Sequence, residues 1–163
     1  MKNKMKGRAW RFKDNVDTDQ VIPAEYLITG DPKELSKHVF EKVRPDFAGS
    51  VKVGDMIVGG KNFGCGSSRE HAVRALMGAG ISCVIAESFA RIFYRNSINL
   101  CLPPVECTME VKNGDLLDVD LVEGRIQNLT DGRLYSFRQF PSFAILIMQR
   151  GGLMRYVEDS CTE

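Results

Sequence analysis

Three segments of the chain have the hydrophobic and polar pattern of strands. Residues 6–12 alternate in the manner of a half-buried strand, with Ala9 and Phe12 as candidates for the inner face. Residues 55–58 form a short apolar segment, and residues 81–86 form a continuous apolar run. Short apolar runs bounded by glycine are typical of buried strands, so both segments are predicted to lie in the core.

Helical periodicity follows each of the two later strands. A helix is predicted over residues 67–77, because the following apolar residues recur at helical spacing: Ala72, Ala75, Leu76 and Ala79. Ser88 is predicted to cap a second helix over residues 89–98. The order strand, loop, helix, strand, helix is typical of a βαβ unit and predicts a partly parallel sheet. Upstream, Asp31 and Pro32 predict the start of another helix.

The pattern changes after Pro103-Pro104. Turn dipeptides that end in glycine recur at residues 113–114, 123–124 and 131–132, which predicts a small antiparallel meander. Two closing helices are predicted on either side of Gly151-Gly152, over residues 142–150 and 152–158. The chain is therefore expected to form a single α/β domain over residues 1–163.

Composition and charge narrow the class of protein. The 163 residues are 44% hydrophobic and 26% charged, a balance typical of a globular domain that buries its own core. A formal charge of +1 gives no electrostatic reason to expect nucleic acid or an anionic membrane as the partner. The basic start has no apolar segment behind it, and no apolar run approaches the roughly 20 residues of a membrane-spanning helix. We expect a cytosolic protein.

The five cysteines do not have the spacing of a metal or disulfide framework. Their number is odd and no CxxC pair occurs. Cys101 and Cys107 are too far apart for a CxxC clip, and Cys83 lies in an apolar run where a buried thiol is expected. The chain is expected to carry no iron–sulfur cluster of its own.

Candidate chemistry is concentrated in residues 64–71, Gly-Cys-Gly-Ser-Ser-Arg-Glu-His. Glycines allow close approach of a ligand to the backbone, and the predicted helix start favours an anion. Arg69 can bind a carboxylate through two parallel hydrogen bonds. The same segment has a second interpretation without function, because Ser67 and Glu70 have the spacing of a capping box.

Other nucleotide-binding and hydrolytic motifs fit less well. Lys61 precedes the glycines, whereas the lysine of a P-loop follows them. A serine or cysteine hydrolase would pair Ser67 or Cys65 with His71 or His38, but no third residue is evident to orient either histidine.

Three separated blocks carry a family resemblance. They are residues 14–24, residues 64–71 and residues 86–96 (Ala-Glu-Ser-Phe-Ala-Arg-Ile-Phe-Tyr-Arg-Asn). In this order they resemble the swivelling domain of the aconitase superfamily, closely from residue 7 to about residue 105. The resemblance implies a swivelling β/β/α fold. The chain length is similar to that of small subunits in which this domain is a separate polypeptide.

The resemblance implies a hydro-lyase active only with a large subunit. In the family, the large subunit holds a [4Fe–4S] cluster whose open iron polarises the substrate hydroxyl. The matching positions make Ser67 the catalytic base, and they assign Arg69, Ser68 and Gly66 to substrate binding. Asp19 matches an aspartate that steadies a histidine of the large subunit. The substrate implied is a small hydroxy-dicarboxylate.

The loop around residues 25–31 is expected to select the substrate. Relatives that act on tricarboxylates tend to have an arginine there, whereas this loop contains Tyr26, Leu27, Ile28 and Thr29. Burying the two methyl groups of an isopropyl side chain against such a loop is worth about 1–2 kcal/mol. We therefore expect 2- or 3-isopropylmalate.

Three alternatives to this expectation stay open. The first is the small subunit of a related dehydratase, either homoaconitase or an enzyme of the methylmalate or citraconate type. The aliphatic residues Leu27 and Ile28 could merely pack the loop. A binding module without enzymatic activity is the third, because the chain alone carries no cofactor.

Overall fold

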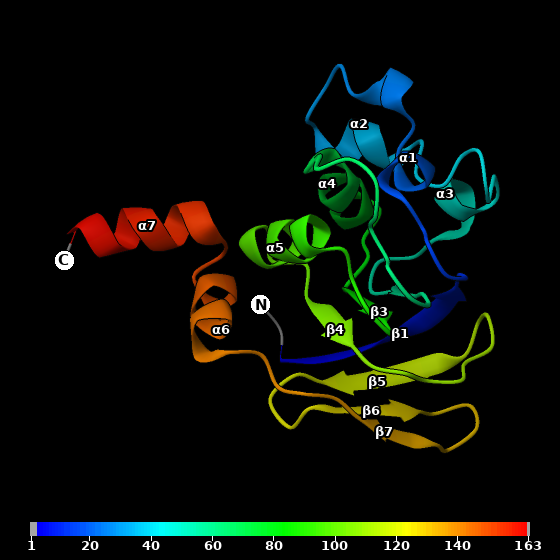
Figure 1. The fold of residues 1–163 in the computed structure, drawn as a ribbon. Helices are drawn as coiled ribbons and strands as arrows, with labels where there is room; N and C mark the ends of the chain where they lie inside the picture. Colours follow the sequence, from blue (N-terminus) through cyan, green and yellow to red (C-terminus); the bar gives the residue numbers. More distant parts are fainter. Residues whose placement is uncertain (1–2, 163) are drawn as a thin grey trace.

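A mixed sheet runs through the computed structural model, which describes residues 3–162 (Figure 1). The strand order is β4-β3-β2-β1-β5-β6-β7. The strands are β1 (Lys4–Arg11), β2 (Met56–Val58), β3 (Cys83–Ala86), β4 (Pro104–Glu106), β5 (Leu116–Asp120), β6 (Arg125–Asn128) and β7 (Leu134–Ser136). Strands β1 to β4 pair in parallel, and β1, β5, β6 and β7 pair antiparallel. The expected partly parallel sheet with an antiparallel meander is confirmed.

Strand β1 joins the two halves of the sheet. It pairs in parallel with β2, with Ala9 opposite Met56, and antiparallel with β5, with Met5 opposite Val119. Ala9 is buried as predicted. Phe12 lies just past the end of the strand, where it stacks on Phe40 with ring centroids 4.2 Å apart.

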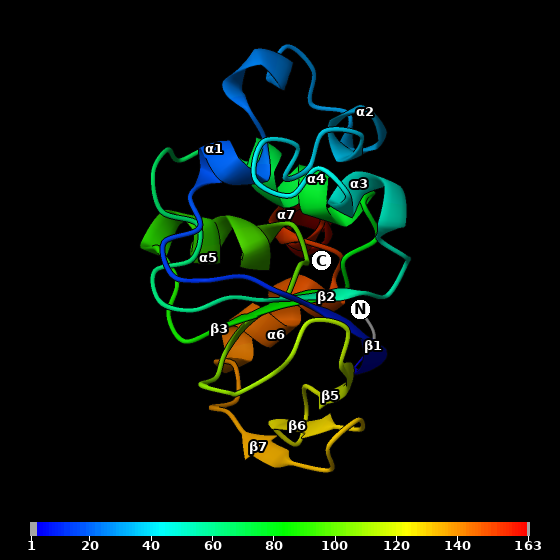
Figure 2. The same ribbon diagram turned by 90° about the vertical axis from the view of Figure 1, so that its right-hand side faces the viewer.

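The helices fall into two groups. The first comprises α1 (Thr18–Val21), the 3₁₀ helix η1 (Ala24–Tyr26), α2 (Pro32–Ser36), α3 (Phe47–Ser50) and α4 (His71–Gly78). The second comprises α5 (Arg91–Asn99), α6 (Ser142–Gln149) and α7 (Leu153–Thr162). Figure 1 and Figure 2 show α1 to α4 on one side of the molecule and the meander on the opposite side.

The parallel strands are buried on both faces because alternate side chains enter two separate cores. Met56 and Val58 contribute to the core that includes α6 and the meander, whereas Ile57 contributes to the core beneath α2 and α4. Val84 of β3 joins Ile57, and Cys83 joins Met56. Burial on both faces explains why these strands are continuously apolar in sequence.

The meander turns where sequence predicts. Gly114, Gly124 and Gly132 all have positive φ, the conformation that favours glycine in such turns. Asp115 beside the first turn is buried, and its carboxylate accepts hydrogen bonds from Asn128 Nδ2 and Lys112 N, both at 2.9 Å. The hydrogen bond from Lys112 N is the main cause that lowers the pKa of Asp115, and the bond from Asn128 lowers it further.

Two predicted helix starts are wrong. Helix α4 begins at His71 instead of Ser67, and no side-chain cap precedes it, so the Ser67–Glu70 capping box does not form. Helix α5 begins at Arg91 without a side-chain cap, and Ser88 Oγ instead accepts a hydrogen bond from Asn62 N at 2.8 Å. Ser67 and Ser88 are instead hydrogen-bonded to residues distant in sequence.

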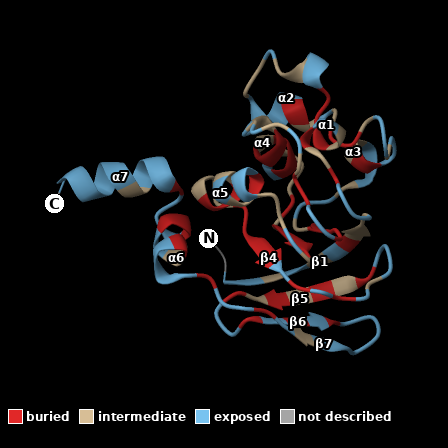
Figure 3. Ribbon diagram, viewed as in Figure 1, coloured by how far each residue is buried: buried red, intermediate tan, exposed pale blue. Residues whose placement is uncertain are grey.

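Asp31 does cap α2, accepting from Lys33 N at 3.0 Å, as predicted. The two closing helices α6 and α7 also form as expected. Helix α7 has no buried residue and projects from the body of the molecule (Figure 3). No helix within residues 3–162 is long and apolar enough to cross a membrane.

Candidate functional site

The three sequence blocks meet beyond the ends of the parallel strands. The first block follows β1 and the glycine-rich block follows β2, and these strands are parallel neighbours. The two blocks therefore continue side by side, with Gly64 N donating to Val16 O at 2.7 Å and Thr18 N donating to Cys65 O at 2.9 Å. The carboxyl ends of parallel strands are where α/β proteins place ligand sites.

The third block reaches the same place from β3. Phe63 N donates to Ser88 O at 3.0 Å, and Ala90 N donates to Phe63 O at 2.9 Å. Further along α5, Asn96 Nδ2 donates to Ser68 O at 3.2 Å. The amide of Asn96 was not expected at this site, although it is the last residue of the third block.

Glycine is required at two positions of the loop. Gly64 has φ +83°, and a side chain there would collide with the ring of Phe93 on α5. Gly66 has φ +96°, and a Cβ atom at this position would lie 3.5 Å from both Asp17 Cβ and Thr18 Oγ1. The backbone is thus held closely against both neighbouring blocks.

Ser67 lies before α4 and is half-buried. Its hydroxyl is 3.4 Å from Thr18 Oγ1, and its backbone N–H donates to the same oxygen at 3.2 Å. Because α4 begins four residues later in the chain, the expectation that Ser67 and Arg69 lie in the first turn of a helix is wrong. The partner of Ser67 is Thr18, which sequence analysis did not single out.

Arg69 and Asp19 form an ion pair at the surface. Arg69 Nη1 lies 3.2 Å from Asp19 Oδ1, and the two side chains are 38% and 68% exposed. Ser68 and Gly66 are also exposed. The structure therefore brings Gly66, Ser67, Arg69 and Asp19 together on an open surface that another chain could cover.

The hydrolase interpretation receives no support from the contacts. Within residues 3–162, neither Ser67 nor Cys65 is hydrogen-bonded to a histidine. His38 Nδ1 instead lies 3.2 Å from Glu41 Oε1. Burial, followed by the nearby Asp17 carboxylate, raises the pKa of Cys65, which disfavours the reactive thiolate.

The loop at residues 25–31 has three anchored side chains. The ring of Tyr26 stacks on His38 with centroids 3.6 Å apart, and Leu27 packs against the core beneath α2 and α4. Thr29 Oγ1 accepts a hydrogen bond from Asp31 N at 3.1 Å. Ile28, in contrast, is 95% exposed. Leu27 thus packs the loop, whereas Ile28 is presented to solvent.

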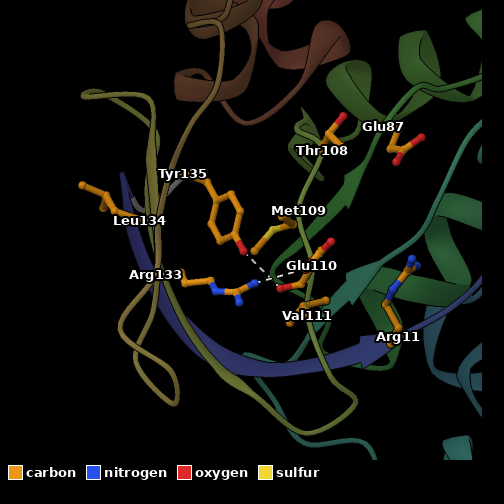
Figure 4. A pocket seen from close by; sticks show the side chains of 9 residues that line it. All are labelled: Arg11, Glu87, Thr108, Met109, Glu110, Val111, Arg133, Leu134 and Tyr135. Atoms are coloured by element: carbon orange, nitrogen blue, oxygen red, sulfur yellow. Dashed lines mark hydrogen bonds and ion pairs between the residues drawn. The ribbon is translucent and has the colours of Figure 1, made fainter.

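A hollow lies elsewhere, beside the meander (Figure 4). Its volume is about 740 Å³, and Arg133 and Glu110 form an ion pair across it at 3.1 Å. Tyr135 also donates to Glu110 O at 3.1 Å. Its lining residues are Arg11, Glu87, Thr108, Met109, Glu110, Val111, Arg133, Leu134 and Tyr135, and none belongs to the predicted site.

Metal ligands do not gather in the described part of the chain. No group of three or more histidine, cysteine, aspartate or glutamate residues within residues 3–162 could hold a metal ion. Cys83 and Cys107 are buried apart from the candidate site, and Cys161 is exposed on α7.

Comparison with known proteins agrees with the family resemblance. The aconitase C-terminal domain family matches residues 51–110. The isopropylmalate/citramalate isomerase small subunit of Methanocaldococcus jannaschii is 54% identical, over 100% of this chain and 99% of the relative. The 3-isopropylmalate dehydratase small subunit of Methanosarcina acetivorans is also 54% identical, over 98% and 99%.

A solved structure agrees at the level of the whole fold. The crystal structure of 3-isopropylmalate dehydratase from Methanocaldococcus jannaschii superposes with a TM-score of 0.94 at 44% identity, covering 98% of this chain and 96% of the other. Identity of this extent along nearly the full length of both chains shows the family. The chain belongs to the family of 3-isopropylmalate dehydratase small subunits within the aconitase superfamily.

Proposed function

We propose that this chain is the small subunit of a hydro-lyase that interconverts 2-isopropylmalate and 3-isopropylmalate by dehydration and rehydration, in leucine biosynthesis. The observation that carries the proposal is the convergence of three blocks on one surface, with Ser67 beside Thr18 and Arg69 paired with Asp19. The names of the full-length relatives agree with it.

Each residue of the site has a proposed role. Arg69 binds a substrate carboxylate, because its planar guanidinium can form two parallel bonds to it. Ser67, as its alkoxide, takes the proton from the carbon next to the one that loses the hydroxyl and becomes the neutral hydroxyl; in the hydration direction it returns that proton. Ser68 and the backbone at Gly66 lie beside them and contact the substrate. Asp19 orients Arg69 and a histidine of the large subunit.

The open surface supports the assignment of the remaining groups to a large subunit. A [4Fe–4S] cluster held there would supply a Lewis acid for the substrate hydroxyl. This chain supplies the proton acceptor and a carboxylate-binding arginine, which lie exposed or half-buried without a covering element. Assembly would cover them and exclude water from the reacting atoms.

Ile28 is the residue proposed to contact the side chain of the substrate. It is the fully exposed member of the loop and is apolar, which suits an isopropyl group better than a third carboxylate. The smaller citramalate is a second candidate substrate, because the relative from Methanocaldococcus jannaschii is named for both. A flat aliphatic contact discriminates poorly between alkyl groups of different size.

The test is to purify the chain with and without the large subunit of the same organism under anaerobic conditions. Hydration of isopropylmaleate and of citraconate is then followed by the loss of absorbance of the double bond. We expect hydration only by the assembled enzyme. Activity of the chain alone would contradict the need for a large subunit, and inactivity of a cluster-loaded assembly on both compounds would contradict the proposed reaction.

A further inference from the structure

The side chain of Thr18 is buried and directed entirely at Ser67. Thr18 is 3% exposed, and its hydroxyl oxygen lies 3.2 Å from Ser67 N, 3.3 Å from Ser67 O and 3.4 Å from Ser67 Oγ. The two residues are 49 positions apart in the chain. A single buried hydroxyl thus contacts the backbone donor, the backbone acceptor and the side chain of one residue.

The hydroxyl of Thr18 is not required to build the helix in which it lies. Asp17 caps α1 through a capping box with Gln20. The backbone of Thr18 is already satisfied, since its N–H donates to Cys65 O at 2.9 Å and its carbonyl accepts from Ile22 N at 3.0 Å. The contacts of Thr18 Oγ1 therefore serve Ser67 and the loop that holds it.

The hydroxyl of Thr18 has one proton and two possible acceptors for it. It accepts from Ser67 N–H and has one proton to donate, to either Ser67 O or Ser67 Oγ. While Ser67 is a neutral hydroxyl, both acceptors are of similar strength. Once Ser67 Oγ carries negative charge it becomes the stronger acceptor, because hydrogen bonds to an ionised oxygen are shorter and roughly twice as strong.

We propose that Thr18 is the positioning residue of Ser67: it fixes the serine backbone and turns its proton to Ser67 Oγ when that oxygen carries negative charge. The inference rests on the proposed function, in which Ser67 accepts a proton from the substrate. Thr18 supplies a hydrogen-bond donor that α4 does not, because the helix begins at His71, beyond Ser67 in the chain. Gly66, with no side chain, leaves room for this arrangement.

The test compares Thr18→Val and Thr18→Ser in the assembled enzyme. Valine keeps the branched shape and removes the hydroxyl, whereas serine keeps the hydroxyl. Losing a donor to the charged oxygen leaves less of Ser67 in its charged form, so Thr18→Val is expected to lower kcat by about 10²-fold with little change in KM. Thr18→Ser is expected to recover most of the rate.

A pH profile separates this role from a merely structural one. Without the donor, the charged form of Ser67 is disfavoured, so the acid limb of kcat in Thr18→Val is expected to move to higher pH. A loop that is only loosened would lose rate at every pH without that displacement. Thermal unfolding of the isolated chain is recorded for each variant, and Thr18→Ala replaces Thr18→Val if the valine variant does not fold.

Ser67→Ala serves as the reference variant. If Ser67→Ala is inactive and Thr18→Val keeps full activity or loses rate without a displaced pH profile, the inference about Thr18 is overturned while the proposed function stands. Turnover by Ser67→Ala would overturn the role of Ser67, and the role of Thr18 with it.

Discussion

The guanidinium of Arg69 lies 3.2 Å from the carboxylate of Asp19, across 50 residues of sequence. Both side chains are substantially exposed, and exposed ion pairs contribute only about 0–1 kcal/mol to stability. The pair is therefore poorly explained as a stabilising contact. It does hold the one guanidinium of the glycine-rich loop against Asp19, where, under the proposed function, a substrate carboxylate would compete with Asp19 for it.

Replacing Asp19 with asparagine should separate the two explanations. The free energy of unfolding of the chain should change by less than about 1 kcal/mol, as for other exposed pairs. Turnover by the assembled enzyme should fall, because in the proposed mechanism Asp19 orients Arg69 and a histidine of the large subunit. Urea unfolding and steady-state kinetics measure the two quantities.

The matched control is Glu34→Gln, which removes the exposed 3.0 Å pair between Glu34 and Lys37 on the outer side of α2. It should leave both stability and turnover nearly unchanged. Equal kinetics of Asp19→Asn and Glu34→Gln would show that the Asp19 carboxylate has no part in the reaction.

Ser67→Ala should abolish turnover without loss of stability. A positioned base contributes about 10²–10⁴-fold to the rate. Because Ser67 caps no helix, the stability cost of about 1 kcal/mol expected for a lost cap should not appear. Ser50→Ala is the control, since Ser50 is an exposed residue at the end of α3 and lies outside the candidate site. Normal turnover by Ser67→Ala would contradict the proposed role of Ser67 as the base.

The contrast between Ser67 and Asp31 shows what sequence could predict. Asp31 bonds a backbone amide two residues away, and this local geometry follows from the spacing of Asp31, Pro32 and the helix behind them. Ser67 had an equally good local partner in sequence, but it bonds Thr18 instead. No local pattern reports a partner 49 residues away, so the capping interpretation was wrong.

The sheet was predictable because its signals are local or repeated. Continuous apolar runs marked β2 and β3, and glycine turns marked the meander. The candidate site was predictable only as a set of residue types. The meeting of its three blocks depends on β1, β2 and β3 being parallel neighbours, and Asn96 and Thr18 enter it through that pairing.

The cysteines offer a direct check on the two cores. Complete burial raises the pKa of Cys83 to about 12, whereas Cys161 is exposed on α7. Iodoacetamide reacts with thiolates, so it should modify Cys161 at neutral pH and spare Cys83 until the chain is unfolded. Peptide mass spectrometry after timed labelling measures both rates, with Cys161→Ser as control. Labelling of Cys83 at a comparable rate in the native chain would contradict the packing of β3.

Tyr26 and Glu41 make the loop at residues 25–31 sensitive to extremes of pH. A hydrogen bond to Glu41 is the main cause that raises the pKa of Tyr26 from 10.0 to about 12. Hydrogen bonds from Tyr26 and then His38 lower the pKa of Glu41 below its usual 4.5. The contribution of Tyr26 to stability is thus present below pH 10 and lost between pH 10 and about 12. That of Glu41 is present above pH 4.5 and lost as the pH falls below that value.

Tyrosinate absorbance tests this directly. The chain has four tyrosines, so the ionisation of Tyr26 is obtained as the difference between the wild-type titration and that of Tyr26→Phe. Glu41→Gln should lower the pKa of Tyr26 toward 10, and Glu34→Gln should not change it. An unchanged Tyr26 titration in Glu41→Gln would mean that their hydrogen bond does not anchor the loop.

Arginine substitutions at Ile28 and Leu27 should have different consequences, although the two residues are adjacent and both aliphatic. Ile28 is 95% exposed, so Ile28→Arg should leave stability unchanged. It should lower kcat/KM for isopropylmalate relative to homoisocitrate or isocitrate, because a guanidinium pairs with a third carboxylate and is left unpaired by an isopropyl group.

Leu27 packs against the core, so Leu27→Arg should instead destabilise the chain. The ratio of kcat/KM values and the melting temperature distinguish the outcomes. If Ile28→Arg folds normally and does not move the ratio toward the tricarboxylate, the exposed isoleucine does not contact the substrate side chain.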